Sequence, residues 1–301
     1  MAQPEQPRAK TWGVGVELAE DHLGPIRFAA TLTQIRPDDA EIGIHVIPDQ
    51  ELLHPLVTHE DADANRKRAV ANVTEVMARE GLKGERVRVE LVEVDEVERG
   101  LSEAAVRLGV DALIVGRRAR RDEDPIVRLG PVTRRLLRRL PAPVIVVPPD
   151  YGDRDDRGLG EGPVILGVEL EEHEAAALEF ARDLAARLDR ELLIAHGTSA
   201  YHWGVSYMPS ATMTQIEQKS REDAGLALQQ WAAARGLGGA RQHVFVGDPV
   251  KQLLQLAHTE DAAVLVTGSR RLGPIERLFL ASVSSEIASG ARCPVAIVPS
   301  S

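Results

Sequence analysis

The chain is an internal duplication, and this constrains its fold more than any other feature. Glu17 and Glu169 end related segments 152 positions apart, and Gly116 and Gly268 lie the same distance apart. The matching pairs, in chain order, are WGVGVEL with VILGVEL, DALIVGRR with AAVLVTGSR, and APVIVVPP with CPVAIVPS. Self-similarity at a fixed spacing indicates repeated structural units. The sequence therefore predicts two similar domains in tandem.

The segment between the copies has the composition of a linker. It reads PPDYGDRDDRGLGEGP and is rich in Pro, Gly and charge, which places the boundary near Tyr151. A length of 301 residues also suits two domains. We expect an N-terminal tail over 1–10, a first domain over 11–150, a linker over 151–162 and a second domain over 163–301.

Each copy alternates short aliphatic runs with amphipathic segments. In EEHEAAALEFARDLAARL, for example, Ala177, Ala181, Leu184 and Leu188 fall on one helical face. Strands alternating with helices predict an α/β fold with a parallel sheet covered on both faces. We expect two tandem doubly wound domains, each with five strands in the order 3-2-1-4-5. Ligands of such sheets bind where the order reverses, between the first and fourth strands.

Composition narrows the classes of protein. The chain is 44% hydrophobic and 27% charged, as in ordinary globular proteins, and its formal net charge is -10. That charge disfavours nucleic acid and anionic membranes as partners of the whole molecule. Cys293 is the single cysteine, the N-terminus lacks an apolar signal core, and no apolar run approaches the roughly 20 residues of a membrane helix. We expect a cytoplasmic protein that does not bind membranes.

The expected topology brings Gly268, Ser269 and Glu169 to one end of the second sheet. The segment ASVSS then opens a helix, whose N-terminal amides and dipole attract anions. A phosphate would fit there. The alternative is that Ser282 or Ser284 merely caps the helix, as serine commonly does.

These segments resemble the universal stress proteins, in particular their tandem two-domain members. The resemblance rests on GDP at 247–249, on VTGSR followed by ASVS, and on the terminal CPVAIVP, and it covers nearly the whole chain. It implies an adenine nucleotide alpha-hydrolase-like fold and a role in stress response. In nucleotide-binding members the fourth strand leads into Gly-x-x-Gly, nine residues, and then Gly-Ser or Gly-Thr.

The family pattern is only partly present in the second copy. Gly268 keeps the first glycine, but Arg271 and Ala281 replace the other two, and the arginines would supply positive charge to phosphate. Glu169 matches the family's adenine-side aspartate. The resemblance thus implies ATP or AMP, with Mg²⁺ accompanying ATP, at a site of Glu169, Gly197, Gly268, Ser269, Arg270, Arg271, Ser282 and Val283.

The first copy departs further from this pattern. Gly116 remains, but Ala119 holds the second glycine position and the closing pair is Gly130-Pro131, whose proline has no N–H for a phosphate. We expect this half to bind nucleotide weakly or not at all. For His45 and His196 we favour hydrogen-bonded strand-end histidines over catalytic ones.

Nine arginines lie between Arg117 and Arg139. Such a cluster can bind nucleic acid or another polyanion. The alternative, which the net charge and the lack of interleaved aromatic residues favour, is a solvated face paired with acids such as Asp122, Glu123 and Asp124. A phosphate-rich ligand or an acidic partner surface lies between these two possibilities.

The sequence favours a binding module over an enzyme. It contains no P-loop, no Gly-x-Ser-x-Gly and no His-Glu-x-x-His, and Glu169 is the one visible general base, so at most weak ATP hydrolysis is expected. The alternative is a nucleotide-independent adaptor, a homodimer whose halves form an intrachain pseudo-dimer through their last strands. The loop SAYHWGVSYMPSAT, with Trp203 and Met208, is either a lid or a packed surface loop.

Overall fold

The structure is a computed structural model that describes residues 8–18, 22–48, 59–117, 129–153, 158–171, 174–198, 210–269 and 283–300. Its contacts divide the chain into two compact units. The first unit comprises residues 1–159 with 294–299, and the second comprises residues 160–293 with 300–301.

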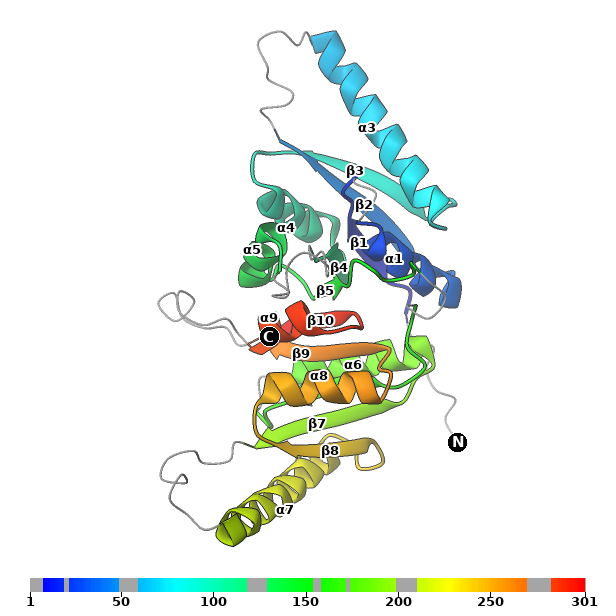
Figure 1. Ribbon diagram of the computed structural model, residues 1–301. Helices are drawn as coiled ribbons and strands as arrows, with labels where there is room; N and C mark the ends of the chain where they lie inside the picture. The colour runs from blue at the N-terminus through cyan, green and yellow to red at the C-terminus, as the bar shows by residue number, and fades with distance from the viewer. Residues whose placement is uncertain are drawn as a thin grey trace. The chain divides into compact units, whose positions relative to one another are not determined.

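The first unit contains a parallel sheet of β1 (Thr11–Gly15), β2 (Ala40–Ile47), β3 (Val87–Glu93), β4 (Ala112–Gly116) and β5 (Val144–Val147). The strand order is β3-β2-β1-β4-β5, which confirms the predicted order. Helices α1 (Gly24–Ile35) and α3 (His59–Arg79) cover one face, and α4 (Val97–Leu108) and α5 (Pro131–Arg139) cover the other (Figure 1). The first and fourth strands are therefore neighbours, as the doubly wound fold requires.

One further strand joins this sheet from the end of the chain. Strand β10 (Val295–Pro299) pairs antiparallel with β5, with Val295 opposite Val146 and Ile297 opposite Val144. Both strands are fully aliphatic along this pairing, and their side chains are buried. The pairing therefore closes an edge of the first sheet that would otherwise expose backbone hydrogen-bonding groups.

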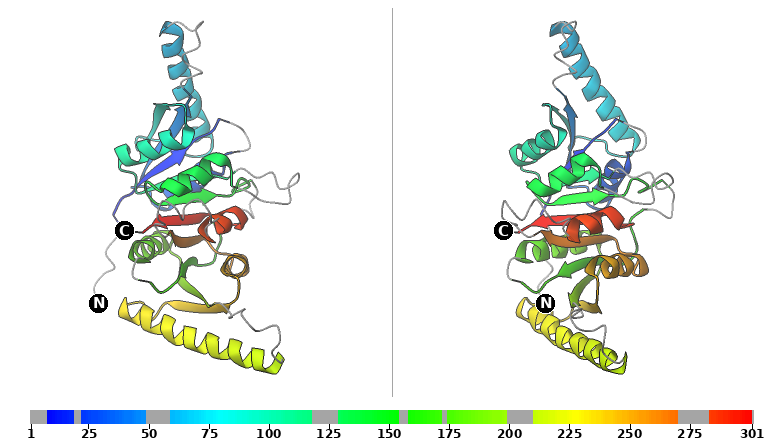
Figure 2. Two further views of the ribbon diagram at one scale, coloured as in Figure 1. Left: turned by 90° about the vertical axis from the view of Figure 1, so that its left-hand side faces the viewer. Right: turned by 60° about the vertical axis from the view of Figure 1, so that its left-hand side comes forward.

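The second unit repeats the first four strands of the plan with β6 (Val164–Val168), β7 (Leu192–Thr198), β8 (Arg241–Val246) and β9 (Val264–Ser269), while the fifth strand expected here, β10, belongs to the first unit. These strands are parallel in the order β9-β6-β7-β8. Helices α6 (Ala175–Leu188) and α7 (Ser210–Ala234) pack on one face, and α8 (Pro249–Thr259) and α9 (Val283–Gly290) on the other (Figures 1 and 2). Again the first and fourth strands of the unit, β6 and β9, are adjacent.

The GDP segment has a clear structural role. Gly247 has φ +114°, a conformation that favours glycine, and it ends the turn after β8. Asp248 caps α8 by accepting hydrogen bonds from the backbone N–H groups of Val250 and Lys251, at 2.9 and 3.2 Å. Pro249 occupies the first helical turn, where its missing N–H has no consequence. The motif is thus a compact strand-to-helix connector.

Tyr151 is anchored within the first unit. Its side chain is buried, its ring packs edge-to-face on Phe28 with centroids 5.5 Å apart, and its hydroxyl donates to Thr31 Oγ1 at 3.3 Å. Arg27 donates to its carbonyl and also pairs with Glu80 at 2.8 Å. Burial raises the pKa of Tyr151 to about 12. The start of the connecting segment is therefore fixed to α1.

Glu41 is a buried acid in the first sheet, at the start of β2. It is fully buried, Thr33 donates a hydrogen bond to its Oε1, and no group among the described residues bonds to Oε2. Burial raises the pKa of Glu41 to about 7, and the nearby Asp39 raises it further while Thr33 and Arg86 lower it. The equivalent place in the second sheet, opposite Val164 on β6, holds Leu192.

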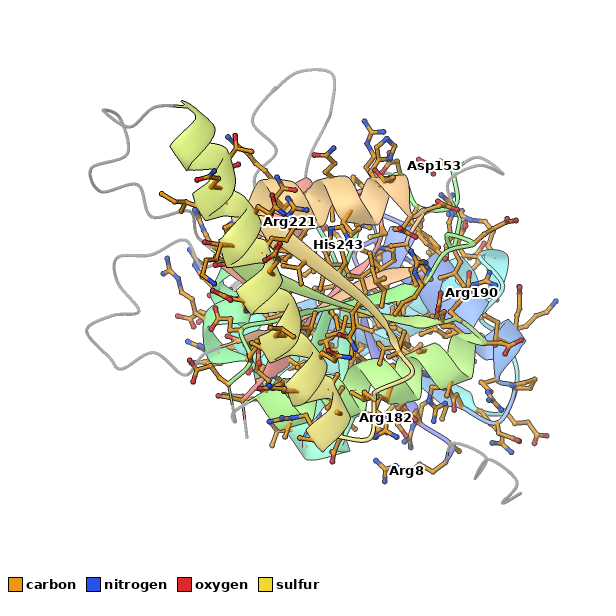
Figure 3. The ribbon with its side chains drawn as sticks, turned by 90° about the horizontal axis from the view of Figure 1, so that it is seen from below. Arg8, Asp153, Arg182, Arg190, Arg221 and His243 are labelled. Carbon is orange, nitrogen blue, oxygen red and sulfur yellow. The ribbon has the colours of Figure 1, made fainter. Side chains whose placement is uncertain are left out.

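The long helix α7 packs on its sheet over only part of its length. Ala224, Leu228 and Trp231 are buried, whereas the side chains from 214 to 223 are exposed except for the half-buried Ser220. Figure 3 shows Arg221 of α7 close to His243 of β8. The pKa of His243 is lowered, first by burial and then by the charge of Arg221. The early turns of α7 therefore carry a surface, mostly polar but including the exposed Ile216, that the described part of the second unit does not cover.

Candidate functional site

The two strand tips that the sequence singles out lie side by side in the second unit. Gly167 on β6 is level with Thr267 on β9, so Glu169 and Ser269 leave the same end of neighbouring strands two residues further on. The Glu169 side chain is exposed, and Val283 is the exposed first residue of α9. Arg270, Arg271 and Ser282 lie outside the described residues. So do the loop 199–209 and Asp122, Glu123 and Asp124.

A hydroxyl ties each fourth strand to the helix that follows it. Thr133 of α5 donates to the carbonyl of Gly116 at 2.8 Å, and Ser284 of α9 donates to the carbonyl of Gly268 at 3.0 Å. Both hydroxyl residues are buried. The hydroxyl of Ser284 thus donates its one hydrogen within the fold, and this side chain has no hydrogen left to donate to a ligand.

The two strand-end histidines also form equivalent contacts. Nδ1 of His45 lies 2.9 Å from the carbonyl oxygen of Val16, and Nδ1 of His196 lies 2.9 Å from that of Val168. Each ring joins the second strand to the first, which agrees with the structural role expected for both residues. A backbone carbonyl oxygen can only accept a hydrogen bond, so Nδ1 is the N–H donor in both rings.

Packing explains Gly197 in the second unit. A Cβ at this position would lie 2.2 Å from Cε2 of Phe245 on the adjacent strand, and Gly197 and Phe245 are paired in the sheet. The glycine is therefore required by the phenylalanine ring, whether or not a nucleotide approaches. The equivalent pair in the first sheet is Val46 with Val92.

Gly268 and Gly116 differ in how closely neighbouring side chains approach. A Cβ at Gly116 would lie 3.3 Å from Cγ of Pro25, whereas among the described residues a Cβ at Gly268 would come no nearer than 3.8 Å to another atom, Cβ of Ala177. Pro25 and Ala177 are equivalent positions, 152 residues apart. Among the described residues, the smaller alanine therefore approaches the Cβ position of Gly268 less closely than Pro25 approaches that of Gly116.

Glu174 is a polar residue near the second tip that no sequence pattern singles out. Its buried carboxylate accepts hydrogen bonds from the backbone N–H of Glu169 at 2.6 Å and of Glu171 at 3.0 Å. The equivalent residue in the first unit is His22, whose Nδ1 lies 2.7 Å from Oε2 of Glu17. In the sequence, Glu174 lies in an acidic run that opens a helix, which gives no sign of this contact.

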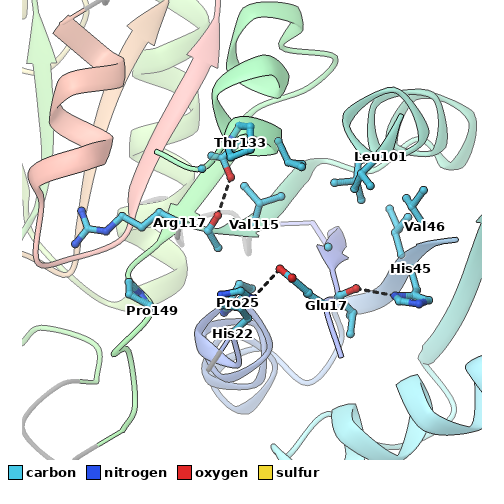
Figure 4. A pocket seen from close by; sticks show the side chains of 18 of the residues that line it. Glu17, His22, Pro25, His45, Val46, Leu101, Val115, Arg117, Thr133 and Pro149 are labelled. Carbon is cyan, nitrogen blue, oxygen red and sulfur yellow. Dashed lines mark hydrogen bonds and ion pairs between the residues drawn. The ribbon is translucent and has the colours of Figure 1, made fainter. Parts of the chain in front are cut away.

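The described residues of the first unit enclose a cavity of about 300 Å³ between the tips of β1 and β4 (Figure 4). Most of its walls are apolar, and Glu17, His22, His45, Arg117 and Thr133 contribute polar side chains. In Figure 4 the Arg117 side chain extends away from Glu17. The remaining lining is Gly15, Val16, Pro25, Ile44, Val46, Pro48, Val97, Leu101, Val115, Gly116, Gly130, Pro131, Val132 and Pro149.

This cavity lies where ligands of such sheets bind, but it offers few hydrogen-bond donors for a phosphate. Its volume is at the lower end of the roughly 300–1,000 Å³ usual for ligand pockets. Pro131 begins α5 without an N–H, and the hydroxyl of Thr133 is bonded to Gly116. These features agree with the expectation of weak nucleotide binding in this half, which remains a prediction.

The described part of the arginine cluster is partly paired. Arg135 lies 3.1 Å from Glu98, and Arg139 lies 3.7 Å from Glu96, both on or beside α4. Arg134 and Arg138 are exposed. The ion pairs support the solvated, acid-paired interpretation of this helix, while the three acids named from the sequence lie outside the described residues.

The described residues lack two kinds of feature. No group of three or more His, Cys, Asp or Glu side chains there is arranged to hold a metal ion. Among the same residues, no helix combines the length and apolar character needed to span a membrane.

Comparisons with known proteins agree on one family. The model of the universal stress protein family matches residues 10–148 and again residues 162–299. Universal stress protein YxiE of Bacillus subtilis is 26% identical over 145 residues, which are 45% of this chain and 97% of that protein. A universal stress protein structure from Archaeoglobus fulgidus has a TM-score of 0.65 at 17% identity, and the match covers 96% of this chain and 98% of that one.

A further solved universal stress protein was crystallised in complex with cAMP. It is 26% identical, and the match covers 47% of this chain and 99% of that one, with a TM-score of 0.31. The double family match, over both repeats, is the finding that decides the identity. The chain belongs to the universal stress protein family, with one copy of the family domain in each half.

Proposed function

We propose that this protein is a cytoplasmic stress-response regulator that binds an adenine nucleotide, ATP or AMP, at the tip of β6 and β9. The observation that carries the proposal is the wide clearance that the described residues leave around Gly268, at a strand end next to the exposed carboxylate of Glu169. A Cβ at Gly268 would meet its nearest described neighbour, Ala177, only at 3.8 Å. A glycine free of crowding lets phosphate approach the backbone closely. Glu169 provides an acceptor for the amino group of an adenine base.

The other proposed contacts are added to Gly268 and Glu169. Ser269 ends β9 and Val283 begins α9, whose N-terminal dipole favours negative charge. Arg270, Arg271 and Ser282 would complete the phosphate side, with Mg²⁺ held by the phosphates of ATP. Gly197 is retained as a neighbour of the site, although its packing on Phe245 already explains it.

Occupancy, not turnover, is the proposed signal. A nucleotide that prefers one arrangement of the segment between β9 and α9 would shift the protein toward it and alter the surface offered to partners. Glu169 is the one general base proposed for any ATP hydrolysis, and weak hydrolysis is the most we expect.

Titration calorimetry with ATP and with AMP tests the proposal. Wild type is expected to bind at least one of them, and Ser282→Ala is expected to bind more weakly. Absence of heat with either nucleotide at millimolar concentration would reject the proposed function.

One observation favours a second candidate, a nucleotide-independent adaptor that acts as a homodimer. The early turns of α7 are exposed and carry Ile216 among long polar side chains, a surface on which a partner could pack. Mass spectrometry of the protein purified without added nucleotide separates the two functions. Copurified ATP or AMP supports the first, and a nucleotide-free protein that is dimeric in solution supports the second.

A further inference from the structure

The same tripeptide takes two conformations in the two halves. Val-Glu-Leu follows β1 at residues 16–18 and lies at the end of β6 at residues 168–170. Leu170 has φ +70°, in the left-handed region that a leucine rarely adopts. The other described residues with positive φ, glycine apart, are Leu140, Asp189 and Asp261, so Leu18 does not share this conformation. Identical local sequence cannot account for the difference.

The difference correlates with the residue four positions after the leucine. In the second half this residue is Glu174, in the first it is His22. The Glu174 carboxylate uses one oxygen for the N–H of Glu169 and the other for the N–H of Glu171, so it bonds on both sides of Leu170. His22 instead contacts the side chain of Glu17.

The Glu174 carboxylate acts on the preceding turn and not on its own helix. Glu174 is the N-cap of α6, yet its side chain makes no capping bond within that helix. The residue is 5% exposed, so it is largely removed from competing water. Two charge-assisted hydrogen bonds in such a place are strong enough to hold a strained residue between them.

From this arrangement we propose that Glu174 is a positioning residue for nucleotide selection in the second half. By clamping the turn at Leu170 it fixes the backbone of Glu169, and so the direction from which the Glu169 carboxylate meets a base. This inference rests on the proposed nucleotide site. An amino group, as at position 6 of adenine, donates to a carboxylate, whereas the carbonyl oxygen of guanine at that position is repelled.

The proposal predicts a loss of selectivity, not a uniform loss of affinity. In Glu174→Ala the ratio of ATP to GTP affinity should fall by about tenfold, and Glu174→Gln, which keeps one acceptor oxygen, should lie between it and wild type. Glu179→Gln is the matched control, because Glu179 is an exposed acid on the same helix. An unchanged ratio in Glu174→Ala, or an equal loss for both nucleotides, would overturn the positioning role.

Hydrogen exchange of the backbone amides tests the Glu174 hydrogen bonds without any nucleotide. The N–H groups of Glu169 and Glu171 should exchange slowly in wild type and in Glu179→Gln, and faster in Glu174→Ala. Equal exchange in all three proteins would show that the clamp does not exist. If wild type binds neither nucleotide, the proposed function fails and the selectivity role with it, while slow exchange would still establish the clamp.

Discussion

The tip of β1 and the tip of β6 were built from one repeated sequence, yet they differ where a ligand would touch them. Pro25 crowds Gly116 in the first half, whereas the equivalent Ala177 is, among the described residues, the nearest neighbour of a Cβ at Gly268, at 3.8 Å. His22 meets the Glu17 side chain, whereas Glu174 binds the backbone around Leu170.

The hydrogen bonds that stabilise each strand tip within its own unit are, in contrast, nearly identical. The hydroxyl-to-carbonyl distances are 2.8 Å at Thr133 and 3.0 Å at Ser284, and both histidine contacts are 2.9 Å. The comparison teaches that scaffold and site are separate sets of residues in this fold. Changes confined to the second set can make two equal scaffolds behave differently.

The largest predicted effect sharpens the contrast between Glu41 and its counterpart Leu192. Burial raises the pKa of Glu41 in the folded protein to about 7, so ionising this carboxylate in the core costs free energy of folding. The stability of the protein with respect to Glu41 is therefore greatest at low pH, and it is lost as the pH rises toward 7 and above. Glu41→Gln should therefore increase the free energy of unfolding by about 3 kcal/mol at pH 8 and change it little at pH 4. Urea denaturation at both pH values measures this. The same gain at both would contradict the assignment.

The next effect concerns the glycine and phenylalanine pair of the second sheet. Gly197→Val alone should destabilise the protein by about 2 kcal/mol, because the new side chain overlaps the Phe245 ring. Gly197→Val combined with Phe245→Val reproduces the Val46 and Val92 pair of the first sheet, and should lose less than the two single changes together, with a coupling of about 1 kcal/mol or more. Strict additivity in a double-mutant cycle would disprove the steric explanation.

A smaller difference is expected between the two leucines of the repeated tripeptide. Leu170→Gly removes the cost of a left-handed leucine and should leave stability unchanged or improved. Leu18→Gly gains no such relief and should cost about 1 kcal/mol through the greater freedom of the unfolded chain. Thermal unfolding of the two variants side by side tests this, and equal losses would show that the turns do not differ in strain.

The smallest contrast is predicted where the halves agree. Thr133→Val and Ser284→Ala each remove one buried hydroxyl bond to a strand-end carbonyl, so each should cost about 1 kcal/mol. Unequal losses in denaturant titrations, well beyond that size, would indicate that one hydroxyl has a further role.

The sequence predicted the parts of the fold that repeat and that follow from local pattern. The alternation of strands and helices follows from aliphatic runs and helix periodicity, and the strand order follows from the right-handed crossovers of a doubly wound sheet. The role of His45 and His196 follows from their place at strand ends. Glu174 was missed because an acidic helix start reads as solvated, and only the folded turn brings amides to it. The packing reason for Gly197 was not visible in the sequence, because its neighbour Phe245 lies 48 positions away on another strand.

The central claim is the proposal that the second half binds adenine nucleotide and that the first binds it weakly or not at all. ATP titration of wild type, Glu17→Ala and Glu169→Ala under the same conditions tests it most directly. The account predicts one ATP per chain in wild type and in Glu17→Ala, and a binding constant at least about tenfold weaker in Glu169→Ala. Binding that survives in Glu169→Ala and disappears in Glu17→Ala would place the site in the first-half cavity and contradict the account.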